Sequence, residues 1–223
     1  MTTPRPPFDA LVLAGGRARR LDGASKPDVL VGGRRLLDRV LDAVAGAGRT
    51  VVVGPPGLAP PPVLCVQEDP PWGGPVAGLE AGLRALARAT DEPARATDAP
   101  AGPAGGGIPA LVLVLACDTP LVAPLVTALL AEAGAAVSAG QDGAWVVDTG
   151  RRPQPLVGAY RRGFLEAALA RAHAAGGTRD ASVRRLLEGA RLRHVPDAVG
   201  QAADADTWDD VARLDERLRA RED

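Results

Sequence analysis

The stretch that decides the fold reads FDALVLAGGRARRLDGASKP and covers residues 8–27. It begins with an apolar run from Phe8 to Ala14 that is closed by Gly15 and Gly16, a pattern typical of a buried β-strand entering a tight turn. Ten residues after Gly16 stands Lys26, the only lysine of the chain. Glycines after a buried strand leave backbone N–H groups open to an anion, and an ammonium group adds a compact positive charge. The stretch therefore predicts a phosphate-binding loop.

Two common nucleotide-binding loops are excluded by the spacing of the glycines. The stretch lacks the Gly-x-Gly-x-x-Gly pattern of dinucleotide-binding folds, and no Gly-Lys-Ser/Thr sequence closes it as in a Walker A loop. A lone lysine is most often a solvated surface residue. The position of Lys26 behind the glycine turn favours a functional role instead.

Strands and helices alternate along the rest of the chain. Short apolar runs predict strands at 51–54, 63–66, 111–116, 144–148 and 155–160, and composition with apolar spacing predicts helices at 36–44, 77–89, 163–174, 181–187 and 207–221. This order predicts an α/β fold with a mostly parallel central sheet and helices on both faces. Asp118 follows the most continuous strand, at the edge where open α/β sheets bind ligands.

The chain is expected to form one domain over residues 1–223. Residues from about 90 to 109 contain Pro, Gly, Ala, Thr and Asp and almost no large apolar side chain. Such a segment buries too little surface to order itself, so we predict a flexible surface loop there rather than a domain boundary.

Composition excludes several classes of function. A net charge of -1 and an aromatic content of 3% argue against a nucleic-acid partner, since neither bulk positive charge nor stacking platforms are present. Cys65 and Cys117 are too few for a disulfide framework and have no metal-ligand spacing. No signal peptide or membrane span is visible in the sequence, so we expect a cytoplasmic protein without a membrane partner.

Several further motifs occur in a fixed order along the chain. After the glycine turn with Arg20 and Lys26 come EDP (68–70), GPVAGL (74–79), CDTP (117–120), QPL (154–156) and DADT (204–207). In this order the sequence resembles the MobA-like nucleotidyltransferases, the molybdenum cofactor guanylyltransferases, over nearly its whole length except the predicted loop. The resemblance implies a three-layer Rossmann-like nucleotidyltransferase fold. It also implies Mg²⁺-dependent transfer of GMP from GTP to molybdopterin, with release of pyrophosphate.

The resemblance assigns roles to individual residues. Nucleotide binding falls to Leu13, Ala14, Gly15, Gly16, Lys26, Asp69, Gly78 and Asp118. Lys26, Arg20 and Asp118 are the expected catalytic residues, because two anions must approach each other while pyrophosphate departs. Asp118 and Asp206 are the expected Mg²⁺ ligands. Gln154 and Asp204 are expected to bind the acceptor.

Two departures from the family pattern leave alternatives open. The usual Asn-x-Asn-Thr-Pro is replaced by Asp204-Ala205-Asp206-Thr207-Trp208, so these carboxylates either serve the site or cap the predicted helix at 207–221. Gly54 stands where the family often has Asn, so the preference for GTP over CTP stays open. A cytidylyltransferase or another small-molecule or sugar-phosphate nucleotidyltransferase of the same fold is one alternative. A non-catalytic nucleotide or cofactor-binding protein is the other, and the oligomeric state is undecided.

Overall fold

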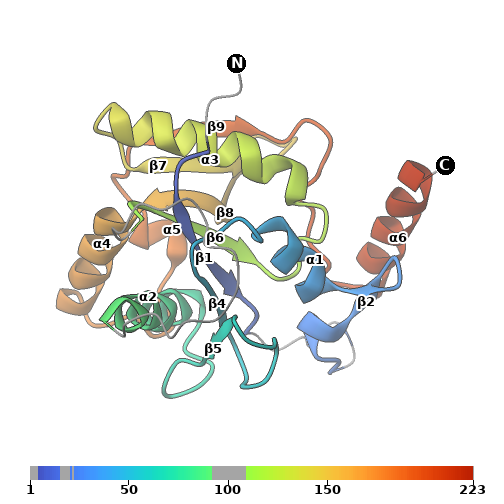
Figure 1. The fold of residues 1–223 in the computed structure, drawn as a ribbon, viewed down its shortest axis with the longest axis horizontal. Helices are drawn as coiled ribbons and strands as arrows, with labels where there is room; N and C mark the ends of the chain where they lie inside the picture. The colour runs from blue at the N-terminus through green and yellow to red at the C-terminus, as the bar shows by residue number, and fades with distance from the viewer. Residues whose placement is uncertain (1–4, 16–20, 22, 92–108, 223) are drawn as a thin grey trace.

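One seven-stranded sheet forms the centre of the computed structural model, which describes residues 5–15, 21, 23–91 and 109–222 (Figure 1). The strand order is β5-β4-β1-β6-β8-β7-β9, and all pairs are parallel except those made by β8. The strands are β1 (Phe8–Leu13), β4 (Thr50–Val53), β5 (Leu64–Val66), β6 (Leu111–Ala116), β7 (Gly143–Val147), β8 (Pro153–Arg161) and β9 (Leu192–Pro196).

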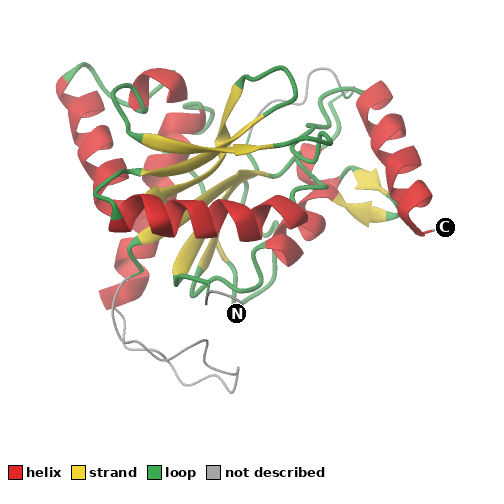
Figure 2. Ribbon diagram, turned by 90° about the horizontal axis from the view of Figure 1, so that it is seen from above, coloured by secondary structure: helices red, strands yellow, loops and turns green. Residues whose placement is uncertain are grey.

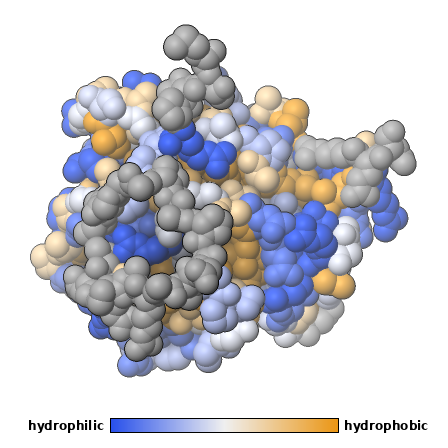
Figure 3. Space-filling view, in the orientation of Figure 1, coloured by the Kyte–Doolittle hydropathy of each residue, from blue (hydrophilic) through white to orange (hydrophobic). Residues whose placement is uncertain are grey.

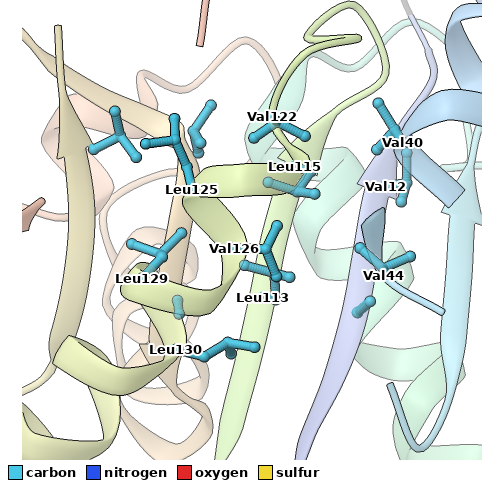
Figure 4. Packing of buried hydrophobic residues seen from close by; sticks show 14 of the residues in the cluster. Val12, Val40, Val44, Leu113, Leu115, Val122, Leu125, Val126, Leu129 and Leu130 are labelled. Carbon is cyan, nitrogen blue, oxygen red and sulfur yellow. The ribbon is translucent and has the colours of Figure 1, made fainter. Parts of the chain in front are cut away.

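Helices cover both faces of this sheet (Figure 2). On one face lie α1 (Leu36–Ala43) and α3 (Ala123–Ser138), and on the other lie α2 (Pro75–Asp91), α4 (Arg162–Ala174) and α5 (Val183–Leu186). Side chains of a strand alternate between faces, so Leu113 and Leu115 of β6 pack with α3 (Figure 4). Val112 and Val114 pack with the helices on the opposite face. The three layers match the predicted fold class.

The central strands β1 and β6 end at the same level. Their register runs from Phe8 opposite Leu111 to Leu13 opposite Ala116, and the Cys117 N–H donates to the Leu13 carbonyl oxygen at 3.0 Å. The chain leaves β1 toward β4 on one side and reaches β6 on the other. Parallel sheets open a crevice at such a switch point, which places the residues after β1 and β6 around one site.

A smaller unit stands beside the sheet. The hairpin of β2 (Leu30–Val31) and β3 (Arg34–Arg35) packs with the C-terminal helix α6 (Trp208–Glu222) around a separate apolar cluster (Figure 1). Arg217 of α6 donates to the carbonyl oxygens of Val199 and Gly200 at 2.7 and 2.8 Å. Hydrophilic side chains gather on the face over α1 and β2 (Figure 3). Within the described residues, no helix is long and apolar enough to cross a membrane.

Most predicted elements are confirmed within a few residues, with three additions. The strands and helices predicted from the sequence do not include α3, β9 or the β2–β3 hairpin. The helix expected at 181–187 is a single turn, α5, whose cap is the Ser182 hydroxyl accepting from the Arg185 N–H at 3.4 Å. Of the predicted loop at 90–109, the first two residues belong to α2, and 92–108 lie outside the described residues.

Candidate active site

A pocket of about 820 Å³ opens at the carboxyl ends of β1, β4 and β6. Its other walls are the start of α2 and the loop that precedes it. The pocket brings together six residues that were predicted from the sequence to belong to the site: Leu13, Gly15, Lys26, Gly78, Asp118 and Asp206. Two of them, Lys26 and Asp206, are 180 positions apart in the chain.

Lys26 lies between two carboxylates in this pocket. Its Nζ is 2.5 Å from Oδ2 of Asp118 and also forms an ion pair with Oδ1 of Asp206. The side chains of Lys26 and Asp118 are 18% and 17% exposed, whereas that of Asp206 is 43% exposed. Burial lowers the pKa of Lys26, but the charges and hydrogen bonds of Asp118 and Asp206 outweigh it, so the net pKa is raised. The ammonium is therefore fully charged at neutral pH.

A short 3-10 helix, η1 (Lys26–Asp28), fixes the position of Lys26. Pro27 is buried, and the Ser25 hydroxyl donates to Oδ2 of Asp28 at 2.6 Å. The other carboxylate oxygen of Asp28 pairs with the Arg35 guanidinium at 2.8 Å, and the same guanidinium donates to the Leu58 carbonyl oxygen at 3.0 Å. Arg35 thereby ties η1 to α1 and to the loop after β4.

The segment before α6 is joined to the end of β6 by its backbone. The N–H of Ala205, which is fully buried, donates to the carbonyl oxygen of Asp118 at 2.9 Å. Asp204 and Asp206 flank this anchor. Asp204 is an exposed residue, yet partial loss of hydration and the negative charges of Asp206 and Asp118 raise its pKa.

The cap of α6 is formed by Thr207 and Asp210. The Asp210 N–H donates to the Thr207 hydroxyl oxygen at 3.2 Å, and the Thr207 N–H donates to Oδ2 of Asp210 at 2.8 Å, which is a reciprocal capping box. These bonds satisfy the helix end without Asp204 or Asp206. Asp206 instead pairs with Lys26.

The space beside Gly15 decides how closely a ligand can approach the end of β1. Among the described residues, a Cβ built on Gly15 would meet only the Val53 carbonyl oxygen, at an ordinary 3.8 Å, so their packing does not demand a glycine there. Gly78 is tighter, because a Cβ on it would lie 3.4 and 3.5 Å from the side chains of Val53 and Leu13. The N–H of Ala14 is already used within the sheet, donating to the Val53 carbonyl oxygen at 2.8 Å.

The other assigned residues lie outside the pocket or outside the described chain. Asp69 is exposed and does not line the pocket. Gln154 donates to Oδ2 of Asp148 at 3.0 Å, and neither Gln154 nor Asp204 lines the pocket. Gly16 and Arg20 fall among the residues that the structure does not describe.

The pocket also contains side chains that were not predicted from the sequence, among them Glu68, Trp72, Leu156 and Arg179. Glu68 immediately precedes the residue that the motif had put forward, so the motif marked the right segment. Arg179 comes from the loop between α4 and α5, which docks when the Asp180 N–H donates to the Gly73 carbonyl oxygen at 2.7 Å. No local pattern near Arg179 indicates this contact.

The donor set suits a hard divalent cation. Two carboxylate oxygens converge on the Lys26 ammonium, so the protein already balances a positive charge at this point, and Mg²⁺ prefers such oxygen ligands. No cluster of three or more His, Cys, Asp or Glu side chains arranged for a metal ion occurs among the described residues. Mg²⁺ commonly takes only one or two carboxylates and completes its shell with phosphate oxygens and water.

Comparison with known proteins identifies the family. Residues 10–196 match the family model of the MobA-like NTP transferase domain. The chain belongs to this family. Within it, a protein from Burkholderia ambifaria named molybdenum cofactor guanylyltransferase is 35% identical over 188 residues, covering 78% of this chain and 80% of the relative. A protein of the same name from Nitrobacter hamburgensis is 36% identical over 88 residues, 37% of this chain and 42% of the relative.

Solved structures of other nucleotidyltransferases share the fold. Molybdopterin-guanine dinucleotide biosynthesis protein A from Archaeoglobus fulgidus superposes with a TM-score of 0.66 at 21% identity, covering 95% of this chain and 99% of that one. The 2-C-methyl-D-erythritol 4-phosphate cytidylyltransferase from Thermus thermophilus gives 0.61 at 21% identity, covering 96% and 99%. The predicted fold and enzyme class are confirmed: this MobA-like protein is a nucleotidyltransferase.

Proposed function

We propose that this MobA-like protein transfers GMP from GTP to molybdopterin with release of pyrophosphate, in a Mg²⁺-dependent reaction. The observation that carries the proposal is the pairing of Lys26 with Asp118 and Asp206 inside the pocket at the ends of β1 and β6. The names of the curated relatives support guanylyl transfer to the molybdenum cofactor as the particular reaction.

The main requirement of the reaction is that the negative charge on the reacting phosphates is neutralised. A phosphate oxygen of molybdopterin attacks the α-phosphorus of GTP, the bond from that phosphorus to the bridging oxygen breaks, and pyrophosphate leaves with the electron pair. Gly15 lets the backbone approach the triphosphate closely, since among the described residues a Cβ there would meet nothing nearer than the Val53 carbonyl oxygen at 3.8 Å. Lys26 lowers the barrier by neutralising negative charge near the α-phosphate, where an oriented ammonium in a partly dry pocket acts strongly.

The two aspartates have a double role in this proposal. They keep the Lys26 ammonium charged and localised before substrate binds, and they are the residues that would hold Mg²⁺. When bound, Mg²⁺ supplies Lewis-acid neutralisation of the phosphate oxygens. Gln154 and Asp204 remain the proposed acceptor-binding residues, and Asp69, Ala14, Gly16 and Arg20 remain proposed contacts of the nucleotide. Residues 1–223 are proposed to form one domain.

Two alternatives make different predictions. A cytidylyltransferase would use the same Gly15, Lys26 and Asp118, and the likeness to the Thermus thermophilus enzyme concerns the fold alone. The curated relatives at 35% identity favour GTP over CTP. A non-catalytic carrier would have no need to concentrate opposed charges beside the phosphate loop.

Pyrophosphate release tests the proposal. Each of the four ribonucleoside triphosphates is incubated with the protein and Mg²⁺, with and without molybdopterin, and once more after chelation with EDTA. We expect release from GTP that requires both molybdopterin and Mg²⁺. Release from CTP alone would reject guanylyl transfer, and release that persists in EDTA would reject the metal requirement. If no pyrophosphate were released from any of the four triphosphates, the proposed reaction would be contradicted.

A further inference from the structure

A single aromatic side chain, Trp72, stands among the described residues that line the pocket. It lies in the loop between β5 and α2 and is 45% exposed, although aromatic residues make up only 3% of the chain. Proteins usually bury so large a ring or place it at a binding surface. The position of Trp72 in the pocket wall therefore calls for a ligand-related explanation.

The backbone holds Trp72 in an unfavourable conformation. Its φ is 67°, in the left-handed region that residues with a Cβ rarely adopt. Oε1 of Glu68 accepts hydrogen bonds from the N–H groups of Trp72 and Gly73 at 3.0 and 3.3 Å. The carbonyl oxygen of Gly73 accepts from the Asp180 N–H at 2.7 Å. The backbone is thus held at Trp72 and Gly73, while the Trp72 side chain remains partly exposed at the pocket.

The neighbours of Trp72 in the pocket favour a nucleotide over the acceptor. The same pocket contains Gly15, Lys26 and Gly78, the residues assigned to the nucleotide, whereas Gln154 and Asp204, assigned to the acceptor, do not line it. Apolar side chains such as Leu13 and Val53 also form its wall. A flat apolar ring fits between such walls, and the base is the flat part of a nucleoside triphosphate.

We infer that the Trp72 indole stacks on the base of the nucleoside triphosphate and makes the site prefer purines to pyrimidines. The inference rests on the proposed function in so far as the pocket binds a nucleoside triphosphate. Stacking depends on overlap of the rings, so a two-ring purine gains more than a one-ring pyrimidine. Stacking reads only the face of the ring, so Trp72 separates GTP from CTP but not GTP from ATP.

Tryptophan fluorescence gives a direct test that needs no turnover. In a Trp145→Phe/Trp208→Phe double variant, Trp72 is the only tryptophan left. We expect GTP and ATP to quench its emission in Mg²⁺ buffer, CTP to do so less, and inorganic tripolyphosphate to leave it unchanged. Equal quenching by tripolyphosphate and GTP, or no quenching by bound GTP, would overturn the stacking.

Affinity measurements with matched variants complete the test. By calorimetry, Trp72→Ala should weaken GTP binding about 10-fold to 100-fold and Trp72→Phe less, with tripolyphosphate binding unchanged. Trp208 is the control, because it is similarly exposed at 47% but does not line the pocket, so Trp208→Ala should bind GTP normally. Unchanged GTP affinity in Trp72→Ala, or a change only in the KM for molybdopterin, would overturn the assignment to the base. If the affinity for nucleoside triphosphates depended on the base but no pyrophosphate were released, the proposed function would be contradicted and the role of Trp72 would be supported.

Discussion

At the amino end of β1, Asp9 lies between two arginines, and at the carboxyl end of the same sheet Lys26 lies between two aspartates. The first cluster is closed: Asp9 has no exposed surface, and the Arg162 side chain is 10% exposed. Arg162 donates to Oδ2 of Asp9 at 2.5 Å and to the Pro109 carbonyl oxygen at 3.2 Å. Arg49 reaches the other carboxylate oxygen at 3.4 Å and the Leu86 carbonyl oxygen at 3.2 Å.

The two clusters differ in what their charges can still do. Burial raises the pKa of Asp9, although the charges of Arg49 and Arg162 act to lower it. Arg162 and Arg49 also donate hydrogen bonds to backbone carbonyl oxygens, so the cluster connects β1 with α4 and with α2. Among the described residues, the Lys26 cluster sets one cation against two carboxylates, and it lines the pocket. The first cluster is therefore enclosed by the fold, whereas the charged groups of the second are accessible to a ligand.

The largest expected effect lies in the closed cluster. Asp9→Leu should lower the free energy of unfolding by about 3 to 5 kcal/mol, because it leaves the buried Arg162 guanidinium without its partner. Urea unfolding followed by circular dichroism measures the loss. Adding Arg162→Met to the Asp9→Leu variant should restore most of the stability. If the double variant is no more stable than Asp9→Leu, the penalty does not come from an unpaired charge.

Substitutions in the Lys26 cluster should affect turnover rather than folding. Lys26→Ala and Asp118→Asn are each expected to slow pyrophosphate release at least about 100-fold, as lost charge stabilisation at the reacting phosphate requires. Their unfolding midpoints should stay close to that of the parent. Asp42→Asn is the control, because Asp42 forms an ion pair with Arg34 on the open surface, with side chains 61% and 52% exposed. Near-normal rates in both site variants would refute the assignment of the reacting centre.

Substitutions at two glycines separate an effect on ligand binding from an effect on stability without changing any charge. Gly15→Ala should weaken GTP binding about 10-fold, equivalent to about 1.4 kcal/mol, and leave stability unchanged, since its Cβ fits the protein but occupies ligand space. Gly82→Ala should do the reverse, because its Cβ would lie 2.8 Å from Leu11 and 3.0 Å from Val53 and should destabilise the fold by about 1 to 3 kcal/mol. Calorimetric titration and urea unfolding on both variants separate the two effects. Loss of stability in Gly15→Ala would show that packing, not the ligand, requires this glycine.

The smallest expected effect is the absence of a pH response. Because the aspartates raise the pKa of Lys26 above its ordinary value of 10.5, the stability that its charge contributes is fully present below pH 10.5. That contribution is lost only as the pH rises through the higher folded pKa. The difference in unfolding free energy between the parent and Lys26→Met should therefore stay constant from about pH 6 to about pH 9. A difference that shrinks over the upper part of this range would mean that burial dominates and the pKa is lowered.

The parts of the site that could be predicted from the sequence are those indicated by residues close to one another in the chain. Gly15 follows closely on the buried run of β1, and Asp118 follows closely on that of β6, so both residues could be placed at the carboxyl edge of the sheet from the sequence. The capping box was also written locally, as Thr207 followed three residues later by Asp210. Recognising this capping box would have left Asp206 free of a capping role, in agreement with its pairing with Lys26 in the structure.

Other features depend on contacts between distant segments. Helix α3 carries apolar residues at most of its 16 positions, so no polar stripe reveals its period. The strands β2 and β3 have two residues each, too few for alternation to be read. Trp72 reaches the pocket through a loop held by Glu68 and Asp180, and the latter contact joins segments that are far apart in the chain. Side-chain direction in such a loop is a property of the folded chain.

The backbone bond from Ala205 to Asp118 makes the second carboxylate partner of Lys26 depend on the last part of the chain. Every strand of the sheet, from β1 to β9, precedes the segment that supplies Asp206. A chain truncated after β9 would keep all of these strands, but of the two carboxylates that pair with Lys26 it would retain Asp118 alone.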